Sequence, residues 1–156
     1  MAYTTYDFYK DTYYGTAIAT QEDFSRLESR ACDKLDTLTF DRLVSGLPAD
    51  TRSATKVQKA VCAVADKLYE IEQMEKMAMS GGYGTDESGN LVGKIVTEKS
   101  SGSEKIAYSA ASTVKSAVLS AVGDTQAQNR LCYETAREYL TGVTNDDGVL
   151  LLYAGI

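Results

Sequence analysis

The sequence contains no histidine among its 156 residues. Histidine is the commonest general acid or base in enzymes, the usual activator of a nucleophilic serine or cysteine, and a frequent zinc ligand. Its absence removes these three kinds of chemistry together. We therefore expect a chain that is not an enzyme, with no catalytic residues, no metal ion and no cofactor.

Cysteine is scarce, with three residues that lie far apart at Cys32, Cys62 and Cys132. No two of them form the C-x-x-C pair that is typical of zinc and redox sites. Each lies in a helical pattern and has alanine or leucine beside it. The sequence therefore predicts three small buried hydrophobic residues in a protein of a reducing compartment.

Clustered basic residues and long apolar runs are also missing. The 16 lysines and arginines are scattered, and the net charge is −6. Nucleic-acid binding normally requires a basic patch, so DNA is expected not to bind specifically. No stretch reaches the roughly 18 apolar residues of a membrane span, and no apolar run follows a basic segment at the N-terminus. We expect a soluble protein that is made in a cytoplasm and does not contact a membrane.

Proline occurs once, at Pro48, where the helical run is predicted to stop. The first helix begins after Thr20, a capping residue that is followed by two acidic residues in the first turn. An apolar connector with Phe40, Leu43, Val44 and Leu47 leads from this helix to Pro48. A second and longer helix is predicted from about Ser53 to Met79. The apolar stripes of the two helices are Phe24, Leu27, Ala31, Leu35 and Leu38, and Val57, Ala60, Val61, Val64, Leu68, Ile71 and Met74.

Two shorter helices are predicted in the C-terminal half of the chain, over about 109–122 and 125–140. Gly123 follows the first and Gly142 follows the second, and glycine is the usual residue just beyond a helix end. The glycine-rich stretch 80–90 is predicted to be a loop.

A β-hairpin is predicted over 93–108, with a two-residue turn at Ser101-Gly102. This register brings opposite charges together near the turn and apolar residues together at the base. Because a lone hairpin is marginal in water, it must lie against its own helices, as a local flap, or against a neighbouring subunit, as an assembly element. The predicted pairs are Lys99–Glu104, Glu98–Lys105, Thr97–Ile106 and Ile95–Tyr108.

The last eight residues, 149–156, are nearly all apolar and are predicted to form a terminal strand. An unpartnered apolar segment is unfavourable in water, so this strand should join a sheet of its own chain or of a partner. We expect the second case, a docking strand.

Aromatic residues crowd the first fourteen positions. Tyrosine is favoured at interfaces because its ring is large and amphipathic. Two interpretations remain open: an interface segment, or a turn or short helix that packs on its own domain. The residues are Tyr3, Tyr6, Phe8, Tyr9, Tyr13 and Tyr14.

These patterns predict a single domain over 1–156 that is mainly α. The expected fold is a small bundle of about four helices with one inserted β-hairpin and a short C-terminal strand. The hairpin base and the tail are the predicted interface: Ile95, Thr97, Ile106, Tyr108, Leu150, Leu151, Leu152, Tyr153 and Ile156.

Short phrases of sequence in this order point to a family. A tyrosine-rich start precedes Thr20-Gln-Glu-Asp-Phe24, the first helix ends in Leu35-Asp-Thr-Leu-Thr-Phe40, and the long helix carries Val57-Gln-Lys-Ala-Val-Cys-Ala-Val64. The hairpin and the tail Leu150-Leu-Leu-Tyr-Ala-Gly-Ile156 follow. Over nearly its whole length the chain resembles the head–tail connector (adaptor) proteins of long-tailed bacteriophages and related prophages.

The resemblance implies a structural neck protein of the virion, made in the cytoplasm of a bacterial host. Such a protein forms a ring with itself, of about twelve copies in this family. The ring docks under the portal protein, extends the DNA channel and gives a platform to the next neck protein (a stopper or head-completion protein) or to a tail protein. DNA passes through the channel without specific binding.

Two other classes of function compete with this interpretation. The first is a regulatory protein-binding module that presents its hairpin or its C-terminal strand to a partner. The second is a small carboxylate-dependent enzyme with candidate residues Glu70, Glu72 and Glu75 on the long helix, of which Glu72 and Glu75 can share one face. A solvated helix face explains these acidic residues more simply.

Overall fold

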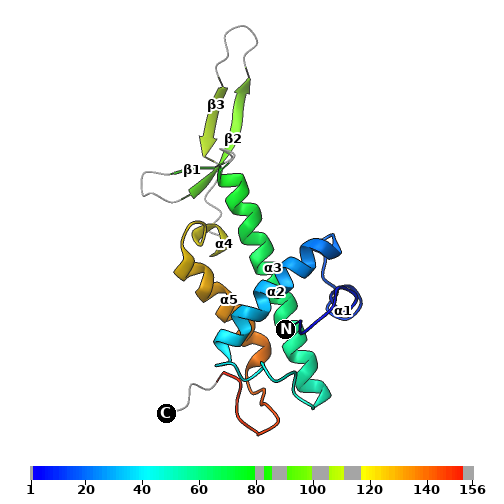
Figure 1. Ribbon diagram of the computed structural model, residues 1–156. Coiled ribbons are helices and arrows are strands. Elements are labelled where there is room, and N and C mark those ends of the chain that lie inside the picture. Colours follow the sequence, from blue (N-terminus) through cyan, green and yellow to red (C-terminus); the bar gives the residue numbers. More distant parts are fainter. Residues whose placement is uncertain (1, 80–82, 86–90, 100–105, 111–116, 153–156) are drawn as a thin grey trace. The chain divides into compact units, whose positions relative to one another are not determined.

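The computed structural model describes residues 2–79, 83–85, 91–99, 106–110 and 117–152. The described chain is mainly helical, as predicted (Figure 1). Its helices are α1 (Tyr6–Asp11), α2 (Gln21–Leu38), α3 (Thr51–Met79), α4 (Ala117–Ser120) and α5 (Thr125–Leu140). Its strands are β1 (Tyr83–Thr85), β2 (Leu91–Lys99) and β3 (Ile106–Ala110).

The chain divides into two compact units. The first unit comprises Met1–Glu70 and Asn129–Ile156, and the second comprises Ile71–Gln128. Both α3 and α5 contribute residues to each unit. The prediction of a single domain over 1–156 stays a prediction.

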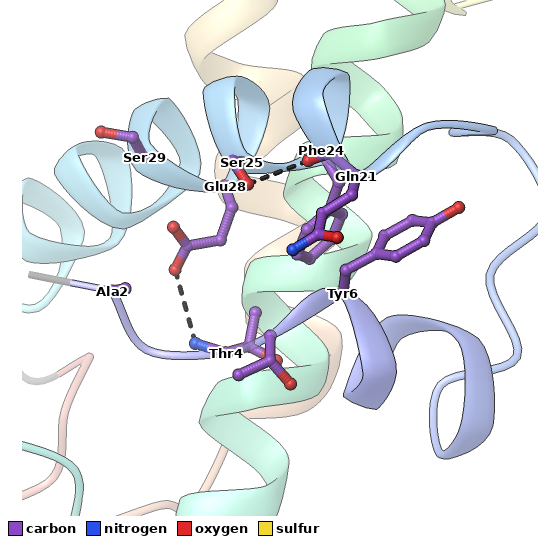
Figure 2. A pocket seen from close by; sticks show the side chains of 9 residues that line it. Ala2, Thr4, Tyr6, Gln21, Phe24, Ser25, Glu28 and Ser29 are labelled. Atoms are coloured by element: carbon purple, nitrogen blue, oxygen red, sulfur yellow. Dashed lines mark hydrogen bonds between the residues drawn. The ribbon is translucent and has the colours of Figure 1, made fainter.

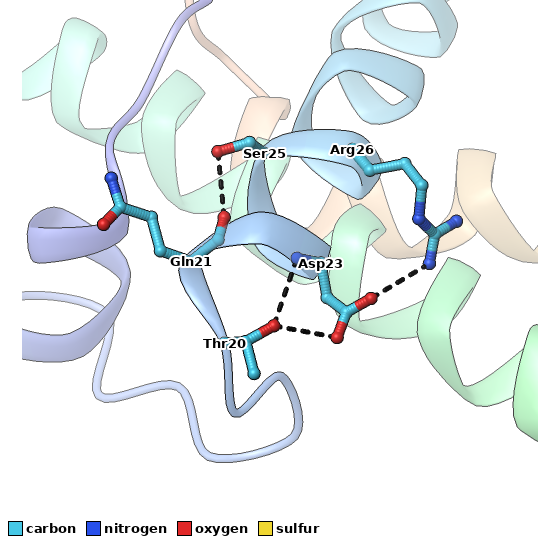
Figure 3. Close-up of polar contacts among 5 residues, drawn as sticks. All are labelled: Thr20, Gln21, Asp23, Ser25 and Arg26. Carbon is cyan, nitrogen blue, oxygen red and sulfur yellow. Dashed lines mark hydrogen bonds and ion pairs between the residues drawn. The ribbon is translucent and has the colours of Figure 1, made fainter.

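The N-terminus of α2 is held by the predicted cap (Figure 3). The Thr20 hydroxyl accepts a hydrogen bond from the Asp23 backbone N–H at 3.2 Å and donates one to Asp23 Oδ2 at 2.8 Å. The other oxygen of Asp23 lies 3.5 Å from the Arg26 guanidinium. These bonds satisfy a backbone donor that the first helical turn leaves free, and they explain why the helix begins at Gln21.

The long helix α3 begins two residues earlier than the predicted start near Ser53. The Asp50 carboxylate accepts a hydrogen bond from the Ser53 backbone N–H at 2.8 Å, so Asp50 caps this helix. Hydrogen bonds from Ser53 hold the pKa of the Asp50 carboxyl below its usual value. The helix has 29 residues, and its end at Met79 is as predicted.

One hydrophobic core fills the first unit, and α2, α3 and α5 all contribute to it. The predicted stripes of α2 and α3 are buried except for Leu38 and Met74, which are half-buried. Helix α5 has its predicted bounds, and Gly142 beyond it has a φ of +75°, a conformation that favours glycine. The largest fully buried side chains of this core include Tyr9, Phe24, Ile18, Leu27, Leu35, Leu43, Leu140 and Leu151.

The second unit carries the three strands in the order β1-β2-β3, all antiparallel. The predicted register between β2 and β3 is wrong. Val96 pairs with Tyr108, Ile95 with Ser109 and Lys99 with Ile106, and the register shifts between Val96 and Glu98. A β-bulge of this kind inserts an extra residue on one strand, and a matching of charges in the sequence does not reveal it. The predicted turn at Ser101-Gly102 lies outside the described residues.

Two further expectations for this unit are corrected. The stretch 80–90, predicted to be a loop, contains β1, whose Gly84 pairs with Val92. The helix predicted over 109–122 begins too early, because Ser109 and Ala110 belong to β3, and the described helix is α4. The three residues of β1 lie in a glycine-rich stretch, whose composition is typical of a loop, which explains why this strand was not predicted.

Candidate interaction surfaces

The chain before α1 is held on α2 by one buried acidic residue, Glu28, which is 5% exposed. Its Oε1 accepts hydrogen bonds from the backbone N–H of Tyr3 at 2.9 Å and of Thr4 at 3.4 Å. It also accepts one from the Cys32 thiol at 3.0 Å. These three bonds tie the N-terminal segment to the middle of α2.

The side chain of Tyr3 continues this attachment. Its hydroxyl donates to Asp36 Oδ1 at 2.5 Å and contacts the Leu43 carbonyl oxygen at 3.0 Å. Burial, and then the hydrogen bond to the Asp36 carboxylate, raise the pKa of the Tyr3 hydroxyl well above its usual value. The Tyr3 carbonyl oxygen accepts from Gln58 Nε2 of α3 at 3.2 Å. The segment therefore bridges two helices of the core.

A second attachment joins α1 to α3 through the buried Tyr9 and the half-buried Asp66. The Tyr9 hydroxyl donates to Asp66 Oδ1 at 2.7 Å and accepts from the Ile18 backbone N–H at 3.0 Å. Burial raises the pKa of both side chains above their usual values, although hydrogen bonds from Tyr9 and Tyr13 favour the charged form of Asp66. Of the two interpretations of the aromatic N-terminus, the structure supports a short helix that packs on its own unit.

An open groove lies between the N-terminal segment and α2 (Figure 2). Its volume is about 450 Å³. Hydroxyl, amide and carboxylate groups line it together with two aromatic rings. The lining residues are Ala2, Thr4, Thr5, Tyr6, Gln21, Phe24, Ser25, Glu28 and Ser29. A surface of this mixed character suits a ligand with both polar and apolar parts.

The chain after α5 is built into the core of its own unit, so the predicted docking strand over 149–156 is wrong in its described part. Leu150 makes a single β-bridge to Thr144, and a turn follows at 151–152. Leu151 is fully buried, and its N–H donates to the Val143 carbonyl oxygen at 2.9 Å. The Arg42 guanidinium donates to the carbonyl oxygens of Leu150 and Leu151, both at 3.1 Å.

The other predicted interface residues lie in three different places. Leu150 is 44% exposed on the first unit, and Leu152 is half-buried against the core. Tyr153 and Ile156 lie outside the described residues. Ile95 and Thr97 belong to β2, and Ile106 and Tyr108 belong to β3. The tail residues therefore belong to the first unit, and the strand residues belong to the second.

An exposed aromatic group marks the end of α2. Phe40 and Asp41 both have a left-handed backbone, with φ of +56° and +59°, and they end the helix. The Arg42 guanidinium lies over the Phe40 ring, 5.2 Å from its centroid. Because Arg42 also holds the carbonyl oxygens of the tail, it links this turn to the C-terminal part of the first unit.

The acidic residues considered for catalysis on α3 make ordinary surface interactions. Glu70 pairs with Lys67 at 2.8 Å, and Glu75 accepts a hydrogen bond from Gln128 at 2.8 Å. Glu72 also has a partner. In the described part of the chain, no three acidic or cysteine residues are grouped as metal ligands. Residues 2–79, 83–85, 91–99, 106–110 and 117–152 contain no helix with the length and apolar character to cross a membrane.

The three cysteines are free thiols and are buried, as predicted. Burial raises the pKa of the Cys62 thiol to about 12, and burial together with the Glu28 carboxylate raises that of Cys32. Thiols with raised pKa values are poor nucleophiles at neutral pH. These residues therefore act as small core side chains.

Sequence reasoning missed the buried carboxylate of Glu28 and the half-buried carboxylate of Asp66. A signal for Glu28 was present, because it lies four residues after Phe24 and falls within the apolar stripe of α2. Asp66 likewise interrupts the buried run of α3 two residues after Val64. A charged residue on a buried face predicts a hydrogen-bonded partner from another part of the chain.

The chain matches no known family model, no curated protein and no solved structure.

Proposed function

We propose that this chain is a structural connector of the head–tail junction of a long-tailed bacteriophage or prophage. In this role, copies of the chain form a ring that docks under the portal protein. The ring extends the DNA channel and gives a platform to the next neck or tail protein. The resemblance of element order and short phrases motivates the proposal, and the division of the chain into two units carries it.

The division matters because the first unit holds the hydrophobic core by itself. Three strands, including the nine-residue β2, belong to the other unit. A sheet of three strands becomes stable when it has a hydrophobic face or packs against a helix. In a ring, a neighbouring copy would cover such a face, with Ile95, Thr97, Ile106 and Tyr108 as the proposed contact residues.

The buried polar groups of the first unit also favour a structural role. The buried Glu28 and the half-buried Asp66 both hold the N-terminal part of the chain by hydrogen bonds. A carboxylate that serves catalysis would be expected to face a site where a substrate could reach it together with a second reacting group. The net charge of −6 is suited to a channel through which DNA passes without binding.

The proposal is tested by assembly of a variant with Ile106→Asp and Tyr108→Asp. Two charges at a contact between copies should abolish rings, because a buried unpaired charge is strongly unfavourable. Ring formation is measured by electron microscopy and native mass spectrometry, and helical content by circular dichroism. The control carries Tyr14→Asp and Val44→Asp, two exposed positions of the first unit. If the variant with altered β3 residues forms rings at the yield of the control, the strands are only a local flap.

A further inference from the structure

The first unit has one exposed surface that is formed by two segments far apart in the sequence, 40–49 and 141–152. The Arg42 guanidinium donates to the Leu150 carbonyl oxygen at 3.1 Å. The Asp146 carboxylate accepts a hydrogen bond from a backbone N–H of the first segment at 2.7 Å. Because these bonds join the segments at two points, the turn after α2 and the chain after α5 lie side by side.

Large apolar side chains stay exposed on both segments. Phe40 is 53% exposed, Leu150 is 44% exposed and Val149 is 38% exposed. The Arg42 guanidinium lies 5.2 Å from the centroid of the Phe40 ring and is bonded to Leu150, so both residues adjoin the same group. We call Phe40, Val149 and Leu150 the apolar patch. Exposed apolar residues that are grouped rather than scattered are typical of interaction sites.

The backbone holds Phe40 in an unfavourable conformation. Its φ is +56°, and that of Asp41 is +59°. A bulky residue rarely adopts this left-handed region, and such strain is concentrated at binding sites, where the surrounding structure imposes it. Here the N–H of Asp41 donates to the Asp36 carbonyl oxygen at 2.8 Å, and that of Arg42 to the Thr39 carbonyl oxygen at 3.2 Å. Phe40 is therefore fixed before a partner arrives, which reduces the entropy lost on binding.

Negative charge surrounds the apolar patch. Asp41, Asp146 and Asp147 are exposed on the two segments. Their only basic residue is Arg42, whose guanidinium is engaged with the tail carbonyl oxygens and the Phe40 ring. Two copies that met at this surface across a twofold axis would bring carboxylates together, which is unfavourable.

We infer that the apolar patch binds a partner protein whose contact surface is apolar at its centre and carries lysine or arginine side chains around it. The apolar side chains of the partner would cover Phe40 and Leu150, and its basic side chains would pair with the exposed carboxylates. This inference goes beyond the connector role and does not depend on it.

The test measures binding of a fluorescent hexapeptide, in which leucine and lysine alternate, to the full chain by fluorescence anisotropy. We expect saturable binding that weakens as salt is added. Two control hexapeptides, with leucine and glutamate or with serine and lysine, should each bind at least about tenfold more weakly. Equal affinity of either control, or no saturable binding of the leucine–lysine peptide, would overturn the inference.

Three variants without a change in charge locate the apolar contact. Phe40→Ser and Leu150→Ser should each weaken binding of the leucine–lysine peptide by about tenfold. Tyr14→Ser alters a residue that is 77% exposed elsewhere on the first unit, and it should change affinity less than about twofold. Circular dichroism checks that each variant is folded. Unchanged affinity in folded Phe40→Ser and Leu150→Ser contradicts the inference.

A matched pair of double variants tests the charges. Asp41→Asn with Asp147→Asn should weaken binding of the same peptide by about tenfold. Asp7→Asn with Asp11→Asn removes the same charge from exposed positions of α1 and should change affinity less than about twofold. Equal losses in both would show that only net charge matters and would overturn the inference. So would a lower assembly mass of Phe40→Ser in native mass spectrometry, because the patch would then be covered by a second copy.

Discussion

Gly15 lies against the ring of Tyr9, a fully buried side chain of the first unit. A Cβ atom at Gly15 would lie 2.1 Å from two ring atoms of Tyr9. The Tyr9 ring cannot move aside, because it is fully buried and its hydroxyl is bonded to both Asp66 and Ile18. It also packs against Phe24, with 4.8 Å between the ring centroids. The sequence therefore requires glycine at position 15 for space rather than for backbone freedom.

Gly15→Ala should lower the free energy of unfolding by about 1–3 kcal/mol, the usual effect of overpacking a core. The measurement is chemical denaturation followed by circular dichroism. Thr16→Ala, an exposed neighbour, is the control and should change stability by less than about 0.5 kcal/mol. Equal stability of the two variants would show that the Tyr9 ring is free to shift.

Asp66 gives stability a dependence on pH. Burial raises the pKa of its carboxyl above the ordinary value of 3.8, so the folded state holds this proton more tightly than the unfolded state does. Its contribution to stability is therefore largest below pH 3.8, falls as pH rises through the folded-state pKa, and is constant above it. Asp66→Asn cannot ionise and should lose this dependence.

The test compares melting temperatures of the wild type and Asp66→Asn between about pH 3.5 and 7. The melting temperature of the variant relative to the wild type should rise with pH over the titration of Asp66. The amide oxygen can still accept the hydrogen bond from Tyr9, so the fold should persist. A difference in melting temperature between the two proteins that stays constant across this pH range would show that the Asp66 carboxyl has the same pKa in the folded and unfolded states.

At the scale of elements, the chain after α5 has a structural role that two neighbouring leucines can test. Leu151 is fully buried in the core, and Leu150 is 44% exposed. Leu151→Ala should lower the free energy of unfolding by about 2–5 kcal/mol, because it leaves a cavity. Leu150→Ala should change it by about 0.5 kcal/mol or less. If both variants are as stable as the wild type, the tail is not part of the core and a docking role returns.

The helices of the first unit were predictable because several local signals agree. Thr20 and Gly142 mark a helix start and a helix end, and the apolar stripe of α2 indicates its buried face. The start of α3 was missed by two residues because Asp50, its cap, follows Pro48 closely and was assigned to the connection. Local patterns therefore gave α2, α3 and α5 within about one turn, whereas α1 was only one of two interpretations of the aromatic N-terminus.

The strands and the candidate site depend on contacts between distant residues, which no single sequence displays. The bulge in β2 changes which residues face each other, and it has no signature in charge matching. The apolar run that begins at Val149 is compatible with a strand or with a buried turn. The hydrogen bonds of Leu151 with Val143 and Arg42, which lie elsewhere in the chain, distinguish the two. The hydrogen-bond partners of Glu28 likewise depend on the return of the N-terminal segment onto α2.

At the scale of the whole molecule, we propose that the two units have different tasks. The first unit folds around its own core and carries the apolar patch at Phe40, Val149 and Leu150. The second unit carries the strands that we propose to meet a neighbouring copy. A single chain that repeats such a contact head to tail closes into a ring when the rotation between copies divides a full turn. The most specific prediction of the connector proposal is therefore the mass of the assembly.

The most direct test is native mass spectrometry of the full chain, purified alone and after co-production with the portal protein encoded in the same genome. One copy has a mass of 16.9 kDa. The connector role predicts a closed ring, with a mass near twelve times that of one copy, alone or bound to the portal, as closed symmetric assemblies require. A chain that stays at 16.9 kDa in both preparations, with no complex with the portal, would contradict it.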